Sequence, residues 1–289
     1  MKLYGTETCI ETEGFEYEDD DKGDCKKKGG KAIPFDIPSF CLAERFYLRR
    51  AAKERNLKED TFAFIKPANL HEDVKYTVVS ATADEGIYRK IFGDNNVDFQ
   101  ECKKAEYRGD LYQYPNKSYS RSSIDNDDGI IERLIKRFGI DEDKVITFMK
   151  YSKGALHFGN TEGSNRFQGK DILVIGTPYH AEFLYKLTAF TYGFDFDEAA
   201  EMNHRLVTRN GYRAMFNTFE DESLRDIQLW MIESELEQAV GRPRLLRNEC
   251  KVHLFSNFPL TQAKVIDDFD CGNDTGENGA VEGGREESN

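Results

Sequence analysis

Short apolar runs of strand length alternate along this chain with longer segments of helical periodicity, and this alternation most constrains the fold. The strand-like runs are Tyr76–Val79, Val145–Met149, Ile172–Ile175 and Val252–Phe255. The helical patterns lie near Asp84–Phe92, Ile130–Phe138, Ala181–Thr191 and Ser223–Ala239. Strands that alternate with helices of this size form βαβ units. We therefore predict an α/β fold with a parallel sheet and ligand chemistry in loops beyond the carboxyl ends of its strands.

Both ends of the chain have compositions that argue against a packed core. Segment 11–31 sets the acidic run EYEDDD beside the basic, glycine-containing run DKGDCKKKGGK, which predicts an exposed loop. Segment 266–289 combines low hydrophobicity with high charge, so burial cannot offset the entropy of ordering it, and we expect a disordered acidic tail. The sequence therefore divides into a loop-rich segment 1–84, a folded domain 85–265 and the tail 266–289.

Composition excludes several classes of protein. No apolar run approaches the roughly 18 residues that a membrane helix needs, and the amino terminus turns acidic where a signal peptide would be apolar. We expect no membrane partner and a cytoplasmic location. The six cysteines form no CxxC pair, which favours reduced thiols and no metal, although a zinc or iron–sulfur site on Cys9, Cys25 and Cys41 is an alternative.

The net charge of −13 weighs against a nucleic-acid partner, because such binding depends on neutralising phosphates with Lys and Arg. Location matters more than the total, however. The tail from Ile266 onward holds eight acids against Arg285 alone, so it carries −7 of that charge. An acidic chain with a basic groove can still bind nucleic acid.

The stretch ESELEQAVGRPRLLRNE places basic residues in a loop after a predicted amphipathic helix. Arginine holds phosphate oxygens with a planar fork, and an arginine brought to a γ-phosphate stabilises the transition state of phosphoryl transfer. Gly241 lets the backbone come close to a ligand. The alternative is that the dipole of a helix carboxyl end attracts basic residues without any ligand.

QAVGRPRLLR resembles motif VI of superfamily-two helicases, whose pattern is Q-x-x-G-R-x-x-R. Gln238, Gly241 and Arg242 occupy its first three fixed positions. The fourth holds Leu245, with Arg244 and Arg247 on either side. The resemblance implies that Gln238 and Gly241 contact a nucleotide and that Arg242, Arg244 or Arg247 is an arginine finger.

Upstream, HFGNTEGSNRFQGKDILVIGTPY combines a glycine-rich polar loop with an apolar strand. It is similar to motif V of the DinG- and XPD-like branch that includes iron–sulfur repair helicases, where an E-G-x-D core precedes a strand ending in G-x-P. Glu162, Gly163 and Asn165 occupy the core positions, which implies nucleotide contacts, and Ser164 between them would contact nucleic acid. A tight turn would explain the same composition but not the order of the residues.

VVSATADE is similar to the S-A-T signature of motif III, which implies that Ser80 and Thr82 contact nucleic acid. The order of these elements from Lys75 to Phe258, with VITFMKY resembling motif IV, matches that of the helicases. The sequence holds no G-x-x-x-x-G-K-[ST] loop and no DExx box before SAT. The resemblance therefore implies that 1–84 ends a first motor lobe, that 85–265 is a RecA-like second lobe, and that ATP and Mg²⁺ bind only with a complementary first lobe.

YRGDLYQYPNKSYSRSS interleaves tyrosines with cations, as single-strand binding requires, because bases stack on rings and phosphates pair with charges. We expect Arg108, Tyr114 and Arg121 to form such a surface, although tyrosine-rich segments are also common in proteins that bind no nucleic acid.

The leading hypothesis is thus the C-terminal motor lobe of an ATP-dependent helicase acting on DNA or RNA, with its first lobe supplied by a separate chain or a longer parent protein. The alternatives are a non-enzymatic nucleic-acid-binding remnant and an unrelated α/β phosphate-binding enzyme.

Overall fold

The computed structural model describes residues 16–19, 25–28, 37–49, 61–65, 70–71, 73–103, 105–153, 156–161, 163–267 and 269. The chain divides into two compact units between Val79 and Ser80. The predicted site residue Glu162 and most of the predicted acidic tail lie outside the described residues.

The first unit contains two antiparallel hairpins and a short helix. Strand β1 (Glu16–Asp19) pairs with β2 (Cys25–Lys28), and β3 (Arg45–Arg49) pairs with β4 (Thr61–Ile65). Helix α1 spans Ile37–Cys41, and its Phe40 packs against the rings of the second hairpin. The prediction that 11–31 is only a loop is therefore wrong. The register of β1 and β2 sets Glu16 opposite Lys28 and Glu18 opposite Lys26.

The second unit is built on a five-stranded parallel sheet, which confirms the predicted α/β class. Its order is β11-β5-β10-β7-β6, and each strand is parallel to its neighbours. The strands are β5 (Asp110–Tyr114), β6 (Val145–Ile146), β7 (Ile172–Ile175), β10 (Lys251–Phe255) and β11 (Lys264–Val265).

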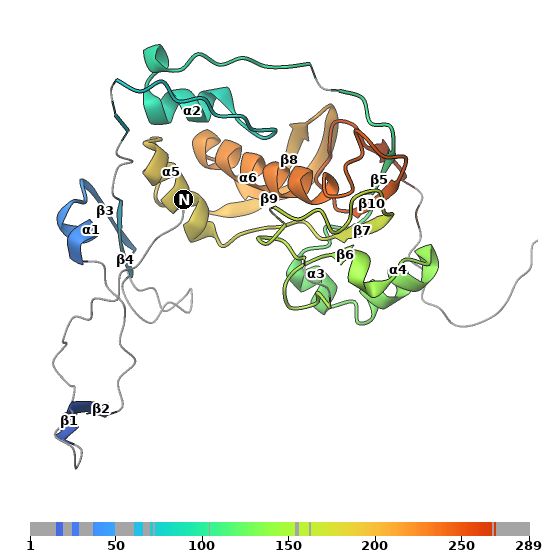
Figure 1. Ribbon diagram of the computed structural model, residues 1–289, viewed down its shortest axis with the longest axis horizontal. Helices are drawn as coiled ribbons and strands as arrows, with labels where there is room; N and C mark the ends of the chain where they lie inside the picture. The colour runs from blue at the N-terminus through green and yellow to red at the C-terminus, as the bar shows by residue number, and fades with distance from the viewer. Residues whose placement is uncertain are drawn as a thin grey trace, which may run out of the picture. The chain divides into compact units, whose positions relative to one another are not determined.

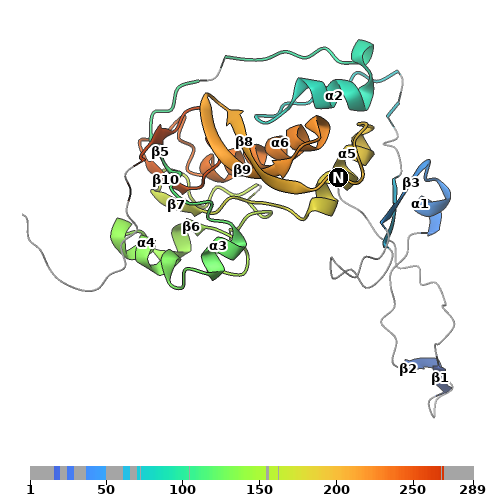
Figure 2. The same ribbon diagram turned by 180° about the vertical axis from the view of Figure 1, so that it is seen from behind.

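Helices cover both faces of this sheet (Figures 1 and 2). Helix α6 (Glu222–Val240) lies on one face, and α3 (Arg121–Asp125) and α4 (Ile130–Phe138) lie on the other. Ile172 and Val174 of β7 belong to the core cluster that contains α6, whereas Leu173 and Ile175 belong to the cluster that contains α4. Strand β7 is fully buried on both faces, which is why its sequence is a continuous apolar run rather than an alternating one.

The remaining elements of the second unit surround α6. Helix α2 (Glu85–Phe92) is capped by Asp84, and α5 (Glu182–Tyr192) precedes a long hairpin of β8 (Met202–Arg209) and β9 (Tyr212–Phe219). Short 3₁₀ turns occupy Asp94–Asn96 and Glu142–Lys144. The four predicted helices are confirmed within one residue at each end. No helix in the described part of the chain is long and apolar enough to cross a membrane.

Several strand assignments differ from the prediction, which did not include β3, β4, β5 or β11. Residues 76–79 form no strand, and the side chain of Val79 is 96% exposed. A β-branched run becomes a strand only where another strand lies beside it, and none does here among the described residues. Strand β6 ends at Ile146 rather than Met149, whose side chain is exposed. Hairpin β8–β9 was not predicted at all.

The first residues of the predicted tail belong to the folded unit. The ring of Phe269 packs on Tyr114 with centroids 4.5 Å apart, and its carbonyl accepts a hydrogen bond from Asn116 Nδ2. The acidic segment 266–289 therefore begins within the folded unit, where the Phe269 ring and carbonyl attach it.

Candidate functional site

The loop from Gly241 to Cys250 joins α6 to β10 and carries the three candidate finger arginines. Helix α6 ends at Val240, and the Gly241 N–H donates to the carbonyl of Glu237 at 3.0 Å. Gly241 has an ordinary helical conformation, with φ of −74°, but a Cβ there would lie only 3.0 Å from the Glu237 oxygen. Glycine thus lets the chain turn closely against the end of its own helix.

Leu245 fixes this loop to the core. Its side chain is 1% exposed and belongs to the cluster between α6 and the sheet. Its carbonyl accepts hydrogen bonds from the backbone N–H groups of Arg108 and Gly109, at 2.9 and 3.1 Å. An arginine here would bury its charge within an apolar cluster, which is costly. This burial accounts for leucine at the fourth position of Q-x-x-G-R-x-x-R.

Arg244 is the arginine that the structure connects to the upstream loop. Its φ of +63° is unusual for a residue other than glycine, and it places the backbone in a tight turn. Its guanidinium Nη2 donates to Asn165 Oδ1 at 3.0 Å, across 79 residues of sequence. Two predicted site residues, Asn165 and Arg244, are therefore in direct contact.

Backbone contacts hold the same two loops side by side. The Gly169 N–H donates to the Pro243 carbonyl at 3.0 Å. The side-chain amide of Asn248 donates to that carbonyl and to the Arg244 carbonyl, at 3.0 and 3.2 Å. Loop 163–170 and loop 241–248 thus form one continuous surface.

The other two arginines have different surroundings. Arg242 is half-buried, and its Nε donates to the Gln238 carbonyl at 3.0 Å, one helical turn earlier. Arg247 is exposed, and within the described part of the chain it forms no ion pair. Arg247 can therefore reach a ligand most freely, whereas Arg242 is the most restrained.

Loop 163–170 contains a glycine turn and a serine turn. Gly163 is exposed with φ of +69°, a conformation that favours glycine. Half-buried Ser164 accepts a hydrogen bond from the Arg166 N–H at 3.3 Å, so its hydroxyl serves the turn.

These loops lie at the amino ends of β7 and β10, not at the carboxyl ends as predicted, because each loop precedes its strand in the sequence. The amino edge also holds Arg108, which pairs with Glu249 at 2.9 Å, and Arg166, which pairs with Asp143 at 3.3 Å. The Asn165 side chain that accepts from Arg244 is a neutral amide, so this contact does not neutralise the charge of the guanidinium. The edge can therefore attract an anion.

The tyrosine-rich segment does not form the single surface that we predicted. Strand β5 runs through it, so Arg108 lies at the amino edge of the sheet and Arg121 follows at the carboxyl edge. Tyr114 is 6% exposed, its ring stacks on Phe255 at 4.5 Å, and its hydroxyl bonds to His253 Nδ1 at 2.9 Å. A ring buried in this way cannot stack on a base, so the prediction that Tyr114 contacts nucleic acid is wrong.

Arg121 remains exposed at the carboxyl edge. Its Nη1 donates to the Tyr179 carbonyl at 3.1 Å, and its guanidinium lies 4.7 Å from the centroid of the Phe148 ring. These contacts come from loops after β6 and β7, and Arg121 follows β5, so the segments after three strands meet at the same place. Phe148 is only 2% exposed, so its ring holds the guanidinium in place and does not stack on a base. The exposed Arg121 side chain offers its charge to a phosphate.

The structure places Ser80 and Thr82 away from the arginine loop. The Thr82 carbonyl accepts a hydrogen bond from Trp230 Nε1 at 2.9 Å, and the Thr82 N–H donates to Ser80 Oγ at 3.2 Å. Trp230 precedes Gly241 by three turns of α6, about 16 Å along the axis. These two residues are therefore not brought together with Arg242 or Arg244.

Sequence reasoning missed the residues that shape the arginine loop, namely Leu245 as an anchor, Asn248 as a brace and Gly109 as a point of close approach. An added Cβ on Gly109 would collide with the Cys250 carbonyl and lie 2.8 Å from the Asn248 carbonyl. In the sequence, only Leu245 could have been noticed, as an apolar residue within a basic loop. The roles of Asn248 and Gly109 depend on contacts with backbone carbonyls, which leave no sequence pattern.

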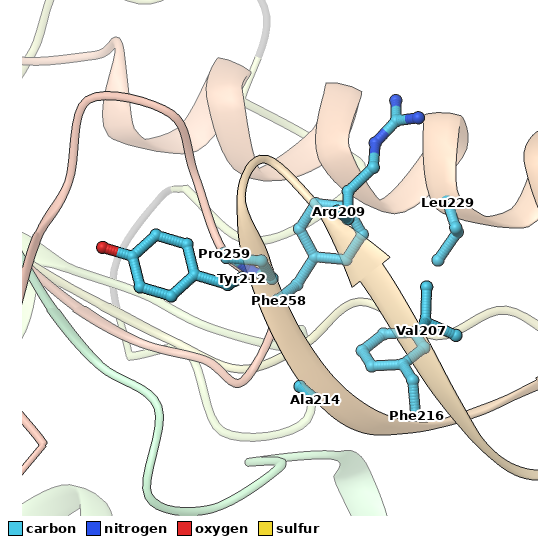
Figure 3. A pocket seen from close by; sticks show the side chains of 8 residues that line it. All are labelled: Val207, Arg209, Tyr212, Ala214, Phe216, Leu229, Phe258 and Pro259. Atoms are coloured by element: carbon cyan, nitrogen blue, oxygen red, sulfur yellow. The ribbon is translucent and has the colours of Figure 1, made fainter.

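A shallow apolar pocket lies apart from these residues, between hairpin β8–β9, α6 and Pro259 (Figure 3). None of the predicted site residues lines it. In the described part of the chain, no three side chains of His, Cys, Asp or Glu gather as metal ligands would; Cys9 lies outside that part. The chain matches no protein family, no curated protein and no solved structure.

Proposed function

We propose that this chain is the RecA-like, C-terminal motor lobe of an ATP-dependent nucleic-acid helicase of superfamily two. The observation that carries the proposal is the hydrogen bond between Arg244 and Asn165, at 3.0 Å. The two residues come from the stretches that resemble motifs VI and V, and the resemblance itself does not require that they touch. A parallel sheet covered by helices on both faces is compatible with the RecA-like fold.

Arg244 is the preferred arginine finger. Asn165 restrains its guanidinium, so less side-chain entropy is lost when the fork meets a phosphate. Arg242 would support the same anion from the end of α6, beside Gln238 and Gly241. Arg247 is the alternative finger because it is exposed next to Arg244.

The proposed lobe does not hydrolyse ATP alone. The residues at the amino edge fit the terminal phosphate of ATP, because their donors are cationic. They do not fit Mg²⁺, which prefers carboxylate ligands, since Asp143 and Glu249 are already paired with arginines. The first lobe would hold Mg²⁺ and most of the triphosphate, and the lobe described here would stabilise charge in the transition state.

Single-stranded nucleic acid would bind at the opposite edge, through Arg121. Phosphate contact by this exposed side chain, which the Phe148 ring and the Tyr179 carbonyl hold in place, is the backbone part of sequence-independent strand binding. Arg108 lies at the nucleotide edge, so it is proposed there instead. Ser80, Thr82 and Ser164 remain proposed nucleic-acid contacts from the resemblance alone.

The test is ATP turnover with a P-loop lobe supplied in trans. Arg244→Ala should lower turnover by on the order of 10³, and Arg242→Ala should also lower it strongly. Arg225→Ala is the matched control, because Arg225 lies near the other end of α6 and bonds to the Glu220 carbonyl. Affinity for single strands should change little in all three variants.

Arg247→Ala completes the set. Loss of turnover only in this variant would move the finger to Arg247. If all three loop variants fold and keep full turnover, the likeness to motif VI is coincidental, and the helix dipole explains the basic loop.

The second candidate is a non-enzymatic, nucleic-acid-binding remnant, favoured by the lack of a P-loop and DExx box in this sequence. It predicts the same strand binding through Arg121 but no turnover with any first lobe. If the chain binds single strands but shows no ATP turnover with any of several related first lobes, the remnant is the better candidate.

A further inference from the structure

Hairpin β8–β9 is a two-stranded ribbon with one face on the protein and one face in solvent. Its strands pair from Met202↔Phe219 to Arg209↔Tyr212, and the turn is Asn210-Gly211, with φ of +50° and +81°. Figure 2 shows the ribbon in front of α6. It belongs to none of the stretches that resemble helicase motifs.

The inner face anchors the ribbon beside the carboxyl-edge loops. The Phe216 ring lies 5.0 Å from that of Tyr179 and 5.8 Å from that of Phe258, measured between centroids. Arg209 pairs with Glu233 of α6, and the Asn210 side chain donates to the Pro259 carbonyl at 2.8 Å. Figure 3 shows this inner face, with Phe216 and Val207 turned toward Leu229.

The outer face carries three cross-strand pairs, which are His204↔Asn217, Leu206↔Met215 and Thr208↔Arg213. Leu206 and Met215 are 51% and 56% exposed, so an apolar pair lies at the centre of the ribbon in contact with water. Polar and basic side chains surround this pair on both sides. No described element covers it.

The ribbon is also free of negative charge. The chain has 53 acidic residues in 289, yet none lies between Met202 and Phe219, where there are three arginines and one histidine. Arg205 and Arg209 pair with Glu220 and Glu233. Arg213 lies on the outer face, and no carboxylate in the described part of the chain pairs with it.

We propose that the outer face of β8–β9 is a second contact surface for single-stranded nucleic acid. Arg213 and His204 contact phosphates, and Leu206 and Met215 lie against sugars and bases. The outer face offers positive charge and carries no acidic side chain that would repel phosphates. A polyanion is therefore its expected occupant.

The position of the ribbon extends the surface at Arg121. Tyr179 links the two, since its carbonyl accepts from Arg121 and its ring packs on Phe216 of the ribbon. This contact is on the inner face of the ribbon, so it places the ribbon next to the Arg121 site, and the outer face is the part of the ribbon proposed to meet the same strand. This inference rests on the nucleic-acid binding in the proposed function and adds residues to it.

The experiment measures fluorescence anisotropy of a labelled 20-nucleotide oligothymidylate across a salt series. Arg213→Glu should weaken binding at least fivefold and reduce the slope of log Kd against log salt by about 1. Lys103→Glu is the control, because Lys103 is exposed on the connection before β5 and the charge change is the same. The double variant Leu206→Ser/Met215→Ser should weaken binding two- to threefold with the salt slope unchanged.

Three outcomes overturn the inference in distinguishable ways. If Arg213→Glu binds like the unsubstituted protein while Arg121→Glu binds weakly, the ribbon is not a contact surface, and the proposed function stands. If the unsubstituted protein does not bind the oligonucleotide at low salt, the nucleic-acid part of the proposed function fails as well. If the double variant changes only the oligomeric state in gel filtration, the outer face docks protein. Thermal unfolding of each variant verifies folding.

Discussion

Replacement of Leu245 by alanine tests whether the arginine loop is anchored as the structure has it. The Leu245 side chain is 1% exposed and packs in the cluster that joins α6 to the sheet. Leu→Ala at such positions removes transfer free energy and leaves a cavity, at a cost of 2–5 kcal/mol. We expect a loss of about 3 kcal/mol in the free energy of unfolding.

The companion variant Leu245→Arg restores the residue that the helicase pattern has at this position. Here it should be the more damaging change, because a guanidinium would enter an apolar cluster with no carboxylate partner. Leu246→Ala is the control, since that side chain is 49% exposed and its loss should change stability by less than about 0.5 kcal/mol.

Urea denaturation followed by circular dichroism gives these free energies directly. For a unit of this size, 3 kcal/mol corresponds to a decrease in Tm of about 6–12 °C. A Leu245→Ala loss below about 1 kcal/mol, or a Leu245→Arg variant as stable as the unsubstituted protein, would refute the anchoring. The fourth motif position would then face solvent and be open to an arginine.

Two further predictions concern the sheet. Gly109→Ala should lower the free energy of unfolding by about 2 kcal/mol or more in the same urea assay, because the added Cβ would collide with the Cys250 and Asn248 carbonyls. Unchanged stability would mean that these carbonyls do not lie against Gly109. Burial lowers the pKa of His253 to about 4 from its ordinary value of 6.5. The unfolded chain therefore binds a proton that the folded protein does not between these two values, so stability should be complete above pH 6.5 and fall as the pH drops toward 4. After allowance for the partial exposure of the ring, the loss in the free energy of unfolding is about 1–2 kcal/mol. Urea titrations of His253→Asn between pH 6.5 and 4 should not show this loss.

Local pattern was sufficient where one periodicity dominates a segment. Ile172–Ile175 and Ile130–Phe138 were predicted with their observed bounds, since an apolar run and a 3.6-residue stripe each report which faces are buried. Hairpin β8–β9 was missed although Asn210-Gly211 between alternating residues is a strong hairpin signal. Residues 76–79 show the opposite failure, because β-branched composition cannot supply the neighbouring strand that pairing requires.

By itself, the sequence determined the α/β class and the order of the candidate motifs, since both are properties of successive residues. Only the tertiary structure decided which motif residues meet: Asn165 and Arg244 touch across 79 residues, whereas Arg108 and Arg121, close in sequence, lie at opposite edges of the sheet. Tertiary packing also turned Leu245 and Tyr114 inward. The physical reason is that a parallel sheet gathers the ends of distant strands at one edge and separates the two ends of each strand, so neighbours in sequence and neighbours in space become different sets.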